Sequence, residues 1–194
     1  MATISLYRGA QIRTLIDELA RLRLTVFREW PYLYAGTFAE EREYLSTYAR
    51  CPQSLAVVAL DGDAIVGAST ALPLADAHAE FSGPFRQAGE GVDVYFYLGE
   101  SVLQHEYRGQ GIGKRLMAER LAEGRQQGFS RAAFCAVDRD PADPRRPADY
   151  RPLATFWQRY GFTRQPHLQA RFRWPEVDGE GEPEHQLTFW TASL

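Results

Sequence analysis

The sequence of 194 residues contains very little lysine, because only Lys114 among its 22 basic side chains is not an arginine. Its net charge of −3 at pH 7 lacks the positive excess of a protein that binds nucleic acid through a basic face. Cys51 and Cys135 are too few for a disulfide framework or a metal cage, and the four histidines lack metal-ligand spacing. No apolar run approaches the roughly 18–20 residues of a membrane helix, and residues 1–10 do not resemble a secretion signal. We therefore expect a cytoplasmic protein without a metal, nucleic-acid or membrane partner.

What is present is a chain that is 45% hydrophobic and 13% aromatic, which is enough for one sizeable domain over residues 1–194. Period-two patterns predict strands at 3–8, 54–60, 64–72, 92–103, 131–137, 167–174 and 185–192. Apolar residues spaced by three and four, or helix-type runs, predict helices at 10–27, 39–50 and 153–160, and a further helix that follows the glycine-rich stretch 108–113 and runs to about Gln127. The turn Asp61-Gly62-Asp63 predicts a hairpin. The order of elements favours an α/β (α+β) domain, with one mixed sheet of about six or seven strands flanked by helices.

The most informative segment is the glycine-rich stretch between the strand 92–103 and the helix that follows it. Gly109, Gly111 and Gly113 alternate, and glycine lets a backbone approach a ligand closely. Free N–H groups at a helix start favour an anion, typically phosphate, and Arg108 and Lys114 add positive charge. The alternative is a glycine turn that only starts a helix.

Two common phosphate-binding patterns do not fit this stretch. A Walker loop needs a hydroxyl residue after Gly-Lys, but Arg115 follows Lys114. The dinucleotide pattern G-x-G-x-x-G fails because the third glycine is wrongly spaced. The pattern R-x-x-G-x-G at Arg108, Gly111 and Gly113 closely resembles the acyl-CoA loop of the GCN5-related N-acetyltransferases, the GNAT superfamily. The late segment Ala154–Phe162 is similar to that family's helix A-x-x-φ-Y-x-x-x-G-F, and the order of elements matches from about residue 3 to 192.

This resemblance implies a single GNAT-like acyltransferase domain with a mostly antiparallel sheet. It implies transfer of an acetyl group from acetyl-CoA to a primary amine of a small molecule or peptide, and a possible homodimer. The main chain of Ser101, Val102 and Leu103 would pair with the pantetheine arm, and an N–H near Leu103 would bind the acetyl oxygen. The pyrophosphate would bind backbone N–H groups of the loop residues Arg108, Gly109, Gln110, Gly111, Ile112, Gly113 and Lys114. His105 stands where the family usually has proline.

The candidate catalytic residues are Glu100 and Tyr160. Because an ammonium has no lone pair, a base must accept its proton before attack, and a carboxylate such as Glu100 on a mainly apolar strand is a candidate. An ion pair between Glu100 and an arginine is the competing interpretation, and Asp93 and Tyr97 are lesser alternatives for the base.

The family's proton donor for the leaving thiolate is often a tyrosine of the late helix, but Trp157 stands there and its indole is hardly an acid. We expect Trp157 to contact CoA and Tyr160, nearly one turn later, to be the donor. Tyr160 could instead be a core or rim residue, and Tyr150 is a weaker candidate.

Three segments are expected to form the acceptor pocket: the aromatic segment 28–48, the excursion 76–91 and the proline-rich loop 138–152. Their aromatic rings could hold a cationic amine by cation–π contact. The acidic turn 176–184 is expected to be a solvated hairpin tip, or else to attract a polycationic acceptor. Two other functions stay open, namely a non-catalytic acyl-CoA-binding module and a nucleotide-binding protein.

Overall fold

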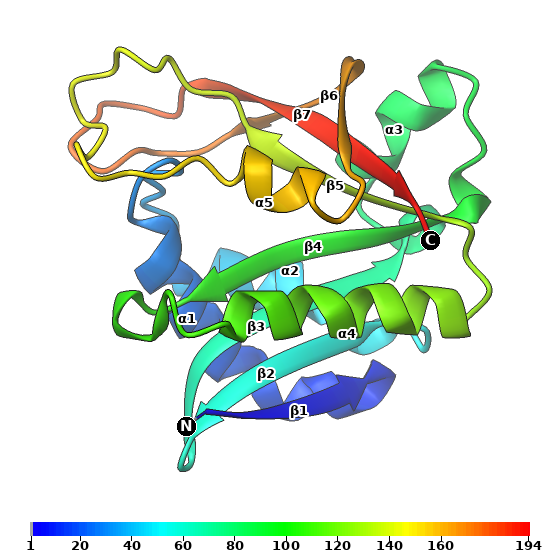
Figure 1. Cartoon of the computed structure of the whole chain (residues 1–194). Helices are drawn as coiled ribbons and strands as arrows, with labels where there is room; N and C mark the ends of the chain where they lie inside the picture. Colours follow the sequence, from blue (N-terminus) through cyan, green and yellow to red (C-terminus); the bar gives the residue numbers. More distant parts are fainter. Residues whose placement is uncertain (1) are drawn as a thin grey trace.

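The computed structural model describes residues 2–194, which form a seven-stranded sheet with helices on both faces (Figure 1). The strands are β1 (Thr3–Arg8), β2 (Leu55–Asp61), β3 (Ala64–Pro73), β4 (Tyr95–Leu103), β5 (Arg131–Val137), β6 (Thr163–Arg173) and β7 (Glu184–Ser193). The α-helices are α1 (Ile16–Phe27), α2 (Phe38–Arg50), α3 (Ala79–Gln87), α4 (Ile112–Gln126) and α5 (Ala154–Gln158). The single mixed sheet and the 61–63 hairpin, which joins β2 to β3, are confirmed.

The strand order is β1-β2-β3-β4-β5-β7-β6, and only the β4–β5 pair is parallel. That pair is short, because β4 and β5 are in register only from Tyr95 to Tyr97 on β4. Beyond Tyr97 the two strands diverge, as Figure 1 shows, while β5 continues to pair with β7 as far as Val137. The sheet therefore splits in its middle, and the last part of β4 has a partner on the β3 side alone.

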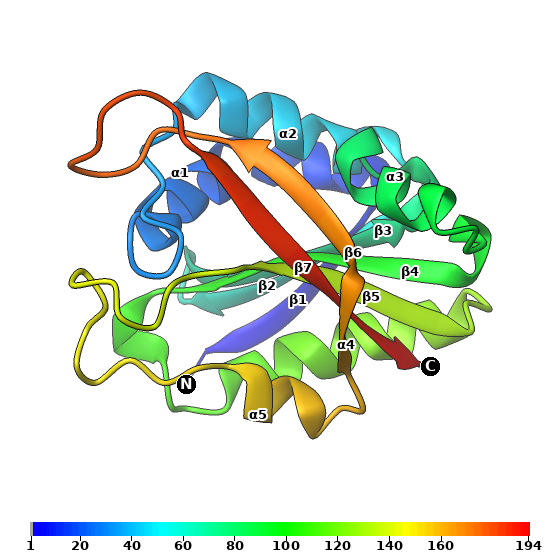
Figure 2. The ribbon, with the colours of Figure 1, turned by 90° about the horizontal axis from the view of Figure 1, so that it is seen from above.

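Helices α1, α2 and α3 cover one face of the sheet, and α4 and α5 cover the other (Figure 2). On the first face Leu19 of α1, Leu45 of α2 and Phe85 of α3 share one buried cluster. On the second face α4 packs through two clusters, one around Met117 and the other around Leu116. This burial of apolar stripes on both faces is what holds the layers together.

A β-bulge changes the register of β4 next to the split. Leu98 pairs with Ala71, whereas Ser101 pairs with Ser69, so β4 has one residue more than β3 between these pairs. Before the bulge Tyr97 faces the α1–α3 layer, and after it Val102 does. Side chains alternate along a regular strand, so Tyr97 and Val102, which are five residues apart, would face opposite sides of the sheet without the bulge. The extra residue turns Glu100 toward α1.

Some element boundaries differ from those that the sequence pattern predicts. The segment 9–15 forms a 3-10 helix before α1, because the chain makes a tight turn at Gly9. Residues 92–94 form another 3-10 turn ahead of β4. The excursion 76–91 contains α3, and β6 begins four residues earlier than predicted, at Thr163.

Candidate active site

The loop before α4 is shaped by glycines. A 3-10 turn at His105–Tyr107 follows β4, and Gly109 and Gly111 then adopt φ angles of 77° and 82°, a region that other residues rarely occupy. Gly111 is the residue before α4, which runs for 15 residues from Ile112. The glycines thus let the chain turn from β4 into α4 within a few residues.

This helix start can hold an anion. Within residues 2–194, the N–H groups of Gly111, Ile112 and Gly113 have no hydrogen-bond acceptor, as expected for the first N–H groups of a helix. A Cβ added at Gly109, Gly111 or Gly113 would meet no other atom within 4 Å, so there is open space beside these three glycines. Free donors, the positive end of the helix dipole and open space together suit a phosphate group.

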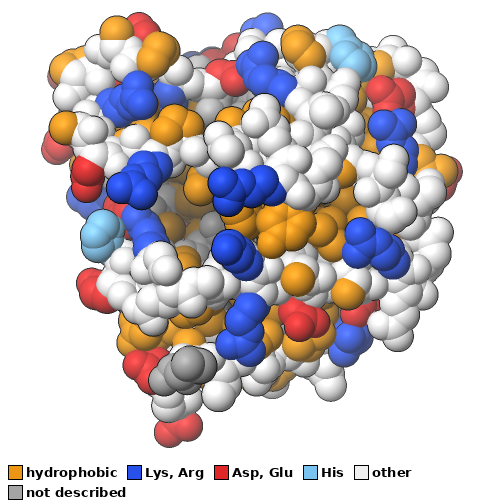
Figure 3. Space-filling model, viewed as in Figure 1, with side chains coloured by type: hydrophobic (Ala, Val, Ile, Leu, Met, Phe, Trp, Pro, Cys, Tyr) orange, Lys and Arg blue, Asp and Glu red, His pale blue; other side chains and the backbone are white. Residues whose placement is uncertain are grey.

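The two basic residues of the loop differ in what they do. The side chain of Arg108 turns back, since its Nε donates to the Leu103 carbonyl at 3.1 Å and its Nη1 lies 2.8 Å from Glu29 Oε2. Lys114 is exposed and forms no salt bridge with any carboxylate among the described residues. On the face of the molecule in Figure 3, Lys and Arg side chains surround exposed hydrophobic surface.

The open edge of β4 leads from this loop to the split in the sheet. The Gln104 N–H donates to the Val66 carbonyl at 3.0 Å, so it points toward β3. Because main-chain groups alternate in an antiparallel pair, Val102 also points toward β3, whereas Ser101 and Leu103 point to the open edge. Of the three predicted pantetheine residues, two therefore present main-chain groups to the open edge. The N–H of Leu103 is available there, in the position predicted for an oxyanion donor.

A cavity of about 350 Å³ lies on the α1–α3 side of the split. It is lined by residues of β4 (Tyr97, Gly99, Glu100), β5 (Cys135), α1 (Arg23, Phe27), α2 (Glu40, Glu41, Tyr44), α3 (Phe81) and the 28–37 segment (Tyr32, Tyr34), and by Phe172, Arg173, Trp174, Pro175, Glu182 and Leu187 from the β6–β7 region. The predicted base Glu100 is thus in the cavity, but Tyr160 and Trp157 do not line it. Of the three segments that were predicted to form the acceptor pocket, 28–48 lines this cavity and 76–91 reaches it through Phe81, whereas no residue of 138–152 is in the lining.

Glu100 belongs to a buried network around Arg23. Arg23 Nη1 lies 2.8 Å from Glu100 Oε2, and its Nε donates to Glu41 Oε2. Only 10% of the Arg23 side-chain surface and 3% of that of Glu100 is exposed. Burial alone would lower the pKa of Arg23, but Glu100 and Glu41 raise it well above its usual value. Arg23 therefore keeps its charge and fixes both carboxylates.

Glu100 therefore has a feature of each interpretation made from the sequence: it forms an ion pair with an arginine, and it also lines a cavity. The Tyr44 hydroxyl donates to Glu100 Oε2 at 3.4 Å and lies 2.9 Å from the Tyr48 hydroxyl. Burial raises the pKa of both tyrosines, so they remain protonated hydrogen-bond donors at neutral pH. Behind the strand, Arg120 of α4 donates to the Glu100 carbonyl at 3.3 Å.

Two further groups bear on the predicted proton donor. The Tyr160 hydroxyl donates a long hydrogen bond of 3.5 Å to the Lys114 carbonyl, so it lies at the start of α4. Trp157 packs against Phe134 and Trp190, with ring centroids 4.9 and 5.2 Å away.

In the cavity the Tyr97 hydroxyl lies 3.5 Å from Cys135 Sγ, and burial raises the pKa of Cys135 to about 12. Cys135 is therefore a thiol at neutral pH and not a nucleophile.

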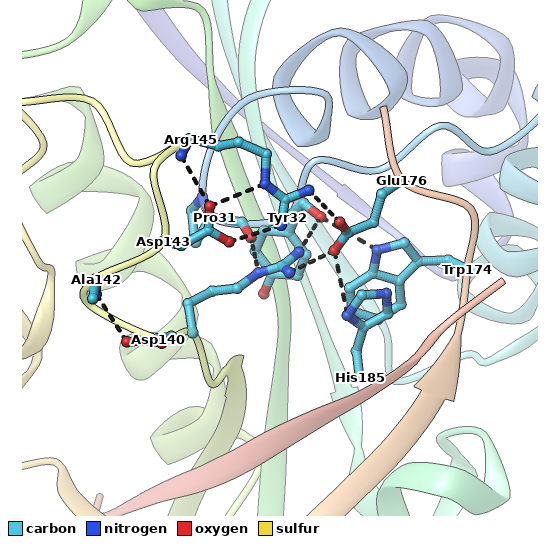
Figure 4. Close-up of polar contacts among 10 residues, drawn as sticks. Pro31, Tyr32, Asp140, Ala142, Asp143, Arg145, Trp174, Glu176 and His185 are labelled. Atoms are coloured by element: carbon cyan, nitrogen blue, oxygen red, sulfur yellow. Dashed lines mark hydrogen bonds and ion pairs between the residues drawn. The ribbon is translucent and has the colours of Figure 1, made fainter. Parts of the chain in front are cut away.

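A second ionic cluster holds the cavity wall from behind. The Arg139 guanidinium donates to the carbonyls of Pro31 and Tyr32 and pairs with Glu176, which also pairs with Arg145. Figure 4 shows Glu176 between Arg145 and the stacked rings of Trp174 and His185. This cluster connects the segments 28–37 and 138–146 to the β6–β7 connection.

The prediction of a solvated acidic tip is wrong at Glu176, because its side chain is only 8% exposed. Burial alone would raise the pKa of Glu176, but hydrogen bonds from Arg145 and Arg139 lower it. The sequence does not reveal this pairing, since Arg139 lies 37 residues away in a proline-rich loop.

Arg23 and the carboxylate of Glu41 are the parts of the site that the sequence did not identify, whereas Tyr44 lies in the aromatic segment expected at the acceptor pocket. One signal was present: Arg23 follows Leu19 by four positions, on the apolar face of α1, where an arginine needs a buried partner. The capping box of Thr37 and Glu40 starts α2 and so sets the positions of Glu41 and Tyr44, which face Arg23.

Residues 2–194 contain no group of three or more His, Cys, Asp or Glu side chains that could hold a metal ion. In the same range no helix combines the length and the apolar character needed to span a membrane.

Solved structures with the same arrangement are acetyltransferases. A GNAT-family acetyltransferase of Staphylococcus aureus Mu50 is 14% identical, with 99% of each chain covered and a TM-score of 0.58. An acetyltransferase of Thermus thermophilus is 18% identical, with 99% of this chain and 97% of that one covered and a TM-score of 0.57. The ribosomal-protein-alanine N-acetyltransferase of Brucella melitensis is 13% identical, with 98% and 99% covered and a TM-score of 0.61. At these identities the likeness establishes the fold alone, and that fold is the GNAT acetyltransferase fold.

The sequence profile of the acetyltransferase (GNAT) family matches residues 21–146, which include part of α1, the split strands and the glycine loop. The chain belongs to this family, and membership implies an acyltransferase. A search of curated protein sequences finds no match.

Proposed function

We propose that this protein is an N-acetyltransferase that transfers an acetyl group from acetyl-CoA to a primary amine by direct attack. One observation carries the proposal: the cavity around Glu100, the open edge of β4 and the free N–H groups of α4 follow one another within one short segment, from Glu100 to Gly113. An anion-binding site, an extended binding edge and a carboxylate are the three features that such a transfer requires.

The residues present fit CoA. The N–H groups of Gly111, Ile112 and Gly113 have no acceptor among residues 2–194, and they would hold the pyrophosphate in the open space beside Gly111 and Gly113, with Lys114 nearby. The main chain of Ser101 and Leu103 would hold the pantetheine arm as an added strand does. When bound, acetyl-CoA supplies the activated acyl group as a thioester.

Glu100 would accept the proton of the acceptor ammonium at its carboxylate. The pairing of Arg23 with both Glu41 and Glu100 leaves this group of three side chains one negative charge in excess, which attracts an ammonium ion. The Leu103 N–H, on the open edge three residues later, would stabilise negative charge on the acetyl oxygen. Tyr160 is our proposed proton donor for the leaving group, acting from its hydroxyl near the start of α4.

The test combines binding and turnover. Calorimetry should show binding of acetyl-CoA and CoA but not of ATP alone, and thiol release should depend on an added amine. Glu100→Gln should lower kcat and flatten its pH dependence while CoA affinity stays unchanged. Glu43→Gln, an exposed carboxylate on α2, is the matched control.

An unaltered pH–rate profile in Glu100→Gln would remove the residue from the role of base. CoA binding without turnover of any amine would favour a non-catalytic binding module. Tight ATP binding without CoA binding would contradict the proposal altogether.

A further inference from the structure

The cavity at Glu100 is mainly aromatic. Eight of its lining residues carry aromatic rings: Phe27, Tyr32, Tyr34, Tyr44, Phe81, Tyr97, Phe172 and Trp174. Two of these rings are already in use, because the Arg23 guanidinium lies 4.8 Å from the centroid of Phe27 and 4.3 Å from that of Tyr44. The other six remain to contact a ligand.

These six rings form two groups that are braced by ring contacts. Tyr32 and Tyr34 lie 6.1 and 6.3 Å from Trp174, between centroids. In the second group Phe81 lies 4.7 Å from Tyr97 and 5.0 Å from Phe172. Rings that pack on one another in this way keep their positions, so they offer a pre-formed apolar surface.

The volume limits the ligand to a small molecule. About 350 Å³ is at the lower end of the range for small-molecule pockets, and it corresponds to the bulk volume of roughly twelve waters. One six-membered ring with a short amine-bearing chain fits such a space.

The charges of the lining favour a cation. Four carboxylates, of Glu40, Glu41, Glu100 and Glu182, stand against two guanidiniums, of Arg23 and Arg173. Arg23 is engaged by Glu41 and Glu100. A ligand carboxylate would therefore meet a lining with two negative charges in excess, whereas an ammonium would be attracted toward Glu100.

We propose that the acceptor is an aralkylamine, a small primary amine that carries one aromatic ring and no carboxylate. Its ring contacts the two aromatic groups and its ammonium contacts Glu100. This inference rests on the proposed acetyl transfer and specifies its substrate.

The first experiment measures binding rather than turnover. Calorimetry on the protein with saturating CoA would use 2-phenylethylamine, ethylamine, spermidine and 3-phenylpropionate as probes. We expect 2-phenylethylamine to bind at least about tenfold more tightly than ethylamine, because the ring fills an apolar cavity. It should also bind more tightly than spermidine, which lacks a ring, and 3-phenylpropionate, which lacks the ammonium. Equal or tighter binding of any of the other three would overturn the inference.

The second experiment tests whether the aromatic ring of the amine contacts Phe172. Phe172→Ala should reduce affinity and kcat/KM for 2-phenylethylamine about tenfold and leave ethylamine and CoA unaffected. Phe172→Leu, which keeps most of the volume, should lie between the two, and thermal melting verifies that each variant folds. Val94→Ala, an exposed residue outside the cavity lining, is the control. Equal losses for 2-phenylethylamine and ethylamine would contradict the placement of the ring.

The two proposals fail in different ways. If CoA binds and ethylamine is acetylated as well as 2-phenylethylamine, the acetyl transfer stands and the aralkylamine inference is wrong. If no amine is acetylated and CoA does not bind, the proposed function is wrong, and calorimetry with the amines alone still decides the ligand class.

Discussion

Replacing Arg23 by methionine should destabilise the protein strongly, because it leaves Glu41 and Glu100 without their shared partner. Arg23 Nη1 lies 2.8 Å from Glu100 Oε2, and only 10% of the arginine side chain is exposed. Removing one partner of a buried ion pair costs about 3–5 kcal/mol of unfolding free energy. At about 2–4 °C per kcal/mol for a protein of this size, the thermal midpoint should fall by roughly 6–20 °C at pH 8.

The loss should depend on pH in a defined direction. Without Arg23, protonation of either carboxylate removes an unpaired buried charge, so the folded variant takes up protons more readily than the native protein. The difference in unfolding free energy between variant and native protein should therefore be larger at pH 8 than at pH 5. Urea unfolding at both pH values measures this difference.

The same two helices provide the control. Arg42 of α2 lies 2.8 Å from Asp17 of α1, but both side chains are more than half exposed. Arg42→Ala should cost less than about 1 kcal/mol at either pH. The reasoning is refuted if Arg23→Met costs no more than Arg42→Ala, or if its cost is the same at pH 5 and pH 8.

Three other perturbations test different parts of the structure. Gly113→Leu adds a side chain in open space at a helical position, so stability should be kept while CoA affinity falls at least about tenfold in calorimetry. Gly83→Leu, which also adds a side chain in open space on a helix, should leave CoA affinity unchanged. Arg120 is buried without a carboxylate in salt-bridge range among residues 2–194, and burial lowers its pKa to about 10. Arg120→Met should therefore raise the thermal midpoint, because it removes a buried charge that has no ion-pair partner. A fall of several degrees would show that the hydrogen bonds of Arg120 outweigh the cost of burying its charge. Burial and Arg139 lower the pKa of His185, so the folded state resists its protonation, and the free energy of unfolding should fall as pH drops below about 6.5. Urea unfolding of His185→Phe, which keeps a ring on Trp174, should show a smaller fall over the same pH range. An unchanged dependence on pH would exclude His185 as its cause.

Local signals in the sequence were sufficient for the hairpin and the glycine loop. Asp61-Gly62-Asp63 makes the predicted turn with Gly62 at φ 60°, and the alternating glycines mark the start of α4. Glu100 could be singled out because a carboxylate is unusual on an apolar strand. These features depend on neighbouring residues alone, so the sequence pattern expresses them directly.

The rest of the site depends on contacts between distant segments. Glu41 reaches Arg23 across 18 residues, and Glu176 reaches Arg139 across 37, and no spacing rule predicts either pair. The alternation of β4 also does not tell which face Glu100 occupies, because the extra residue between Leu98 and Ser101 changes which residues share a face. A bulge of this kind depends on the register with β3, which one strand's sequence does not contain.

The bulge in β4 also limits which mutations this strand accepts. A Cβ at Gly99 would lie 2.2 Å from the Tyr48 hydroxyl and 2.4 Å from Thr70 Oγ1, so the bulge tolerates only glycine at this place without rearrangement. Deleting Gly99 would restore strict alternation with Glu100 still on the α1–α3 side, because Tyr97 and Val102 already face that layer on either side of the bulge. In evolutionary terms, the codon for Gly99 is therefore constrained more strongly against substitution than against loss.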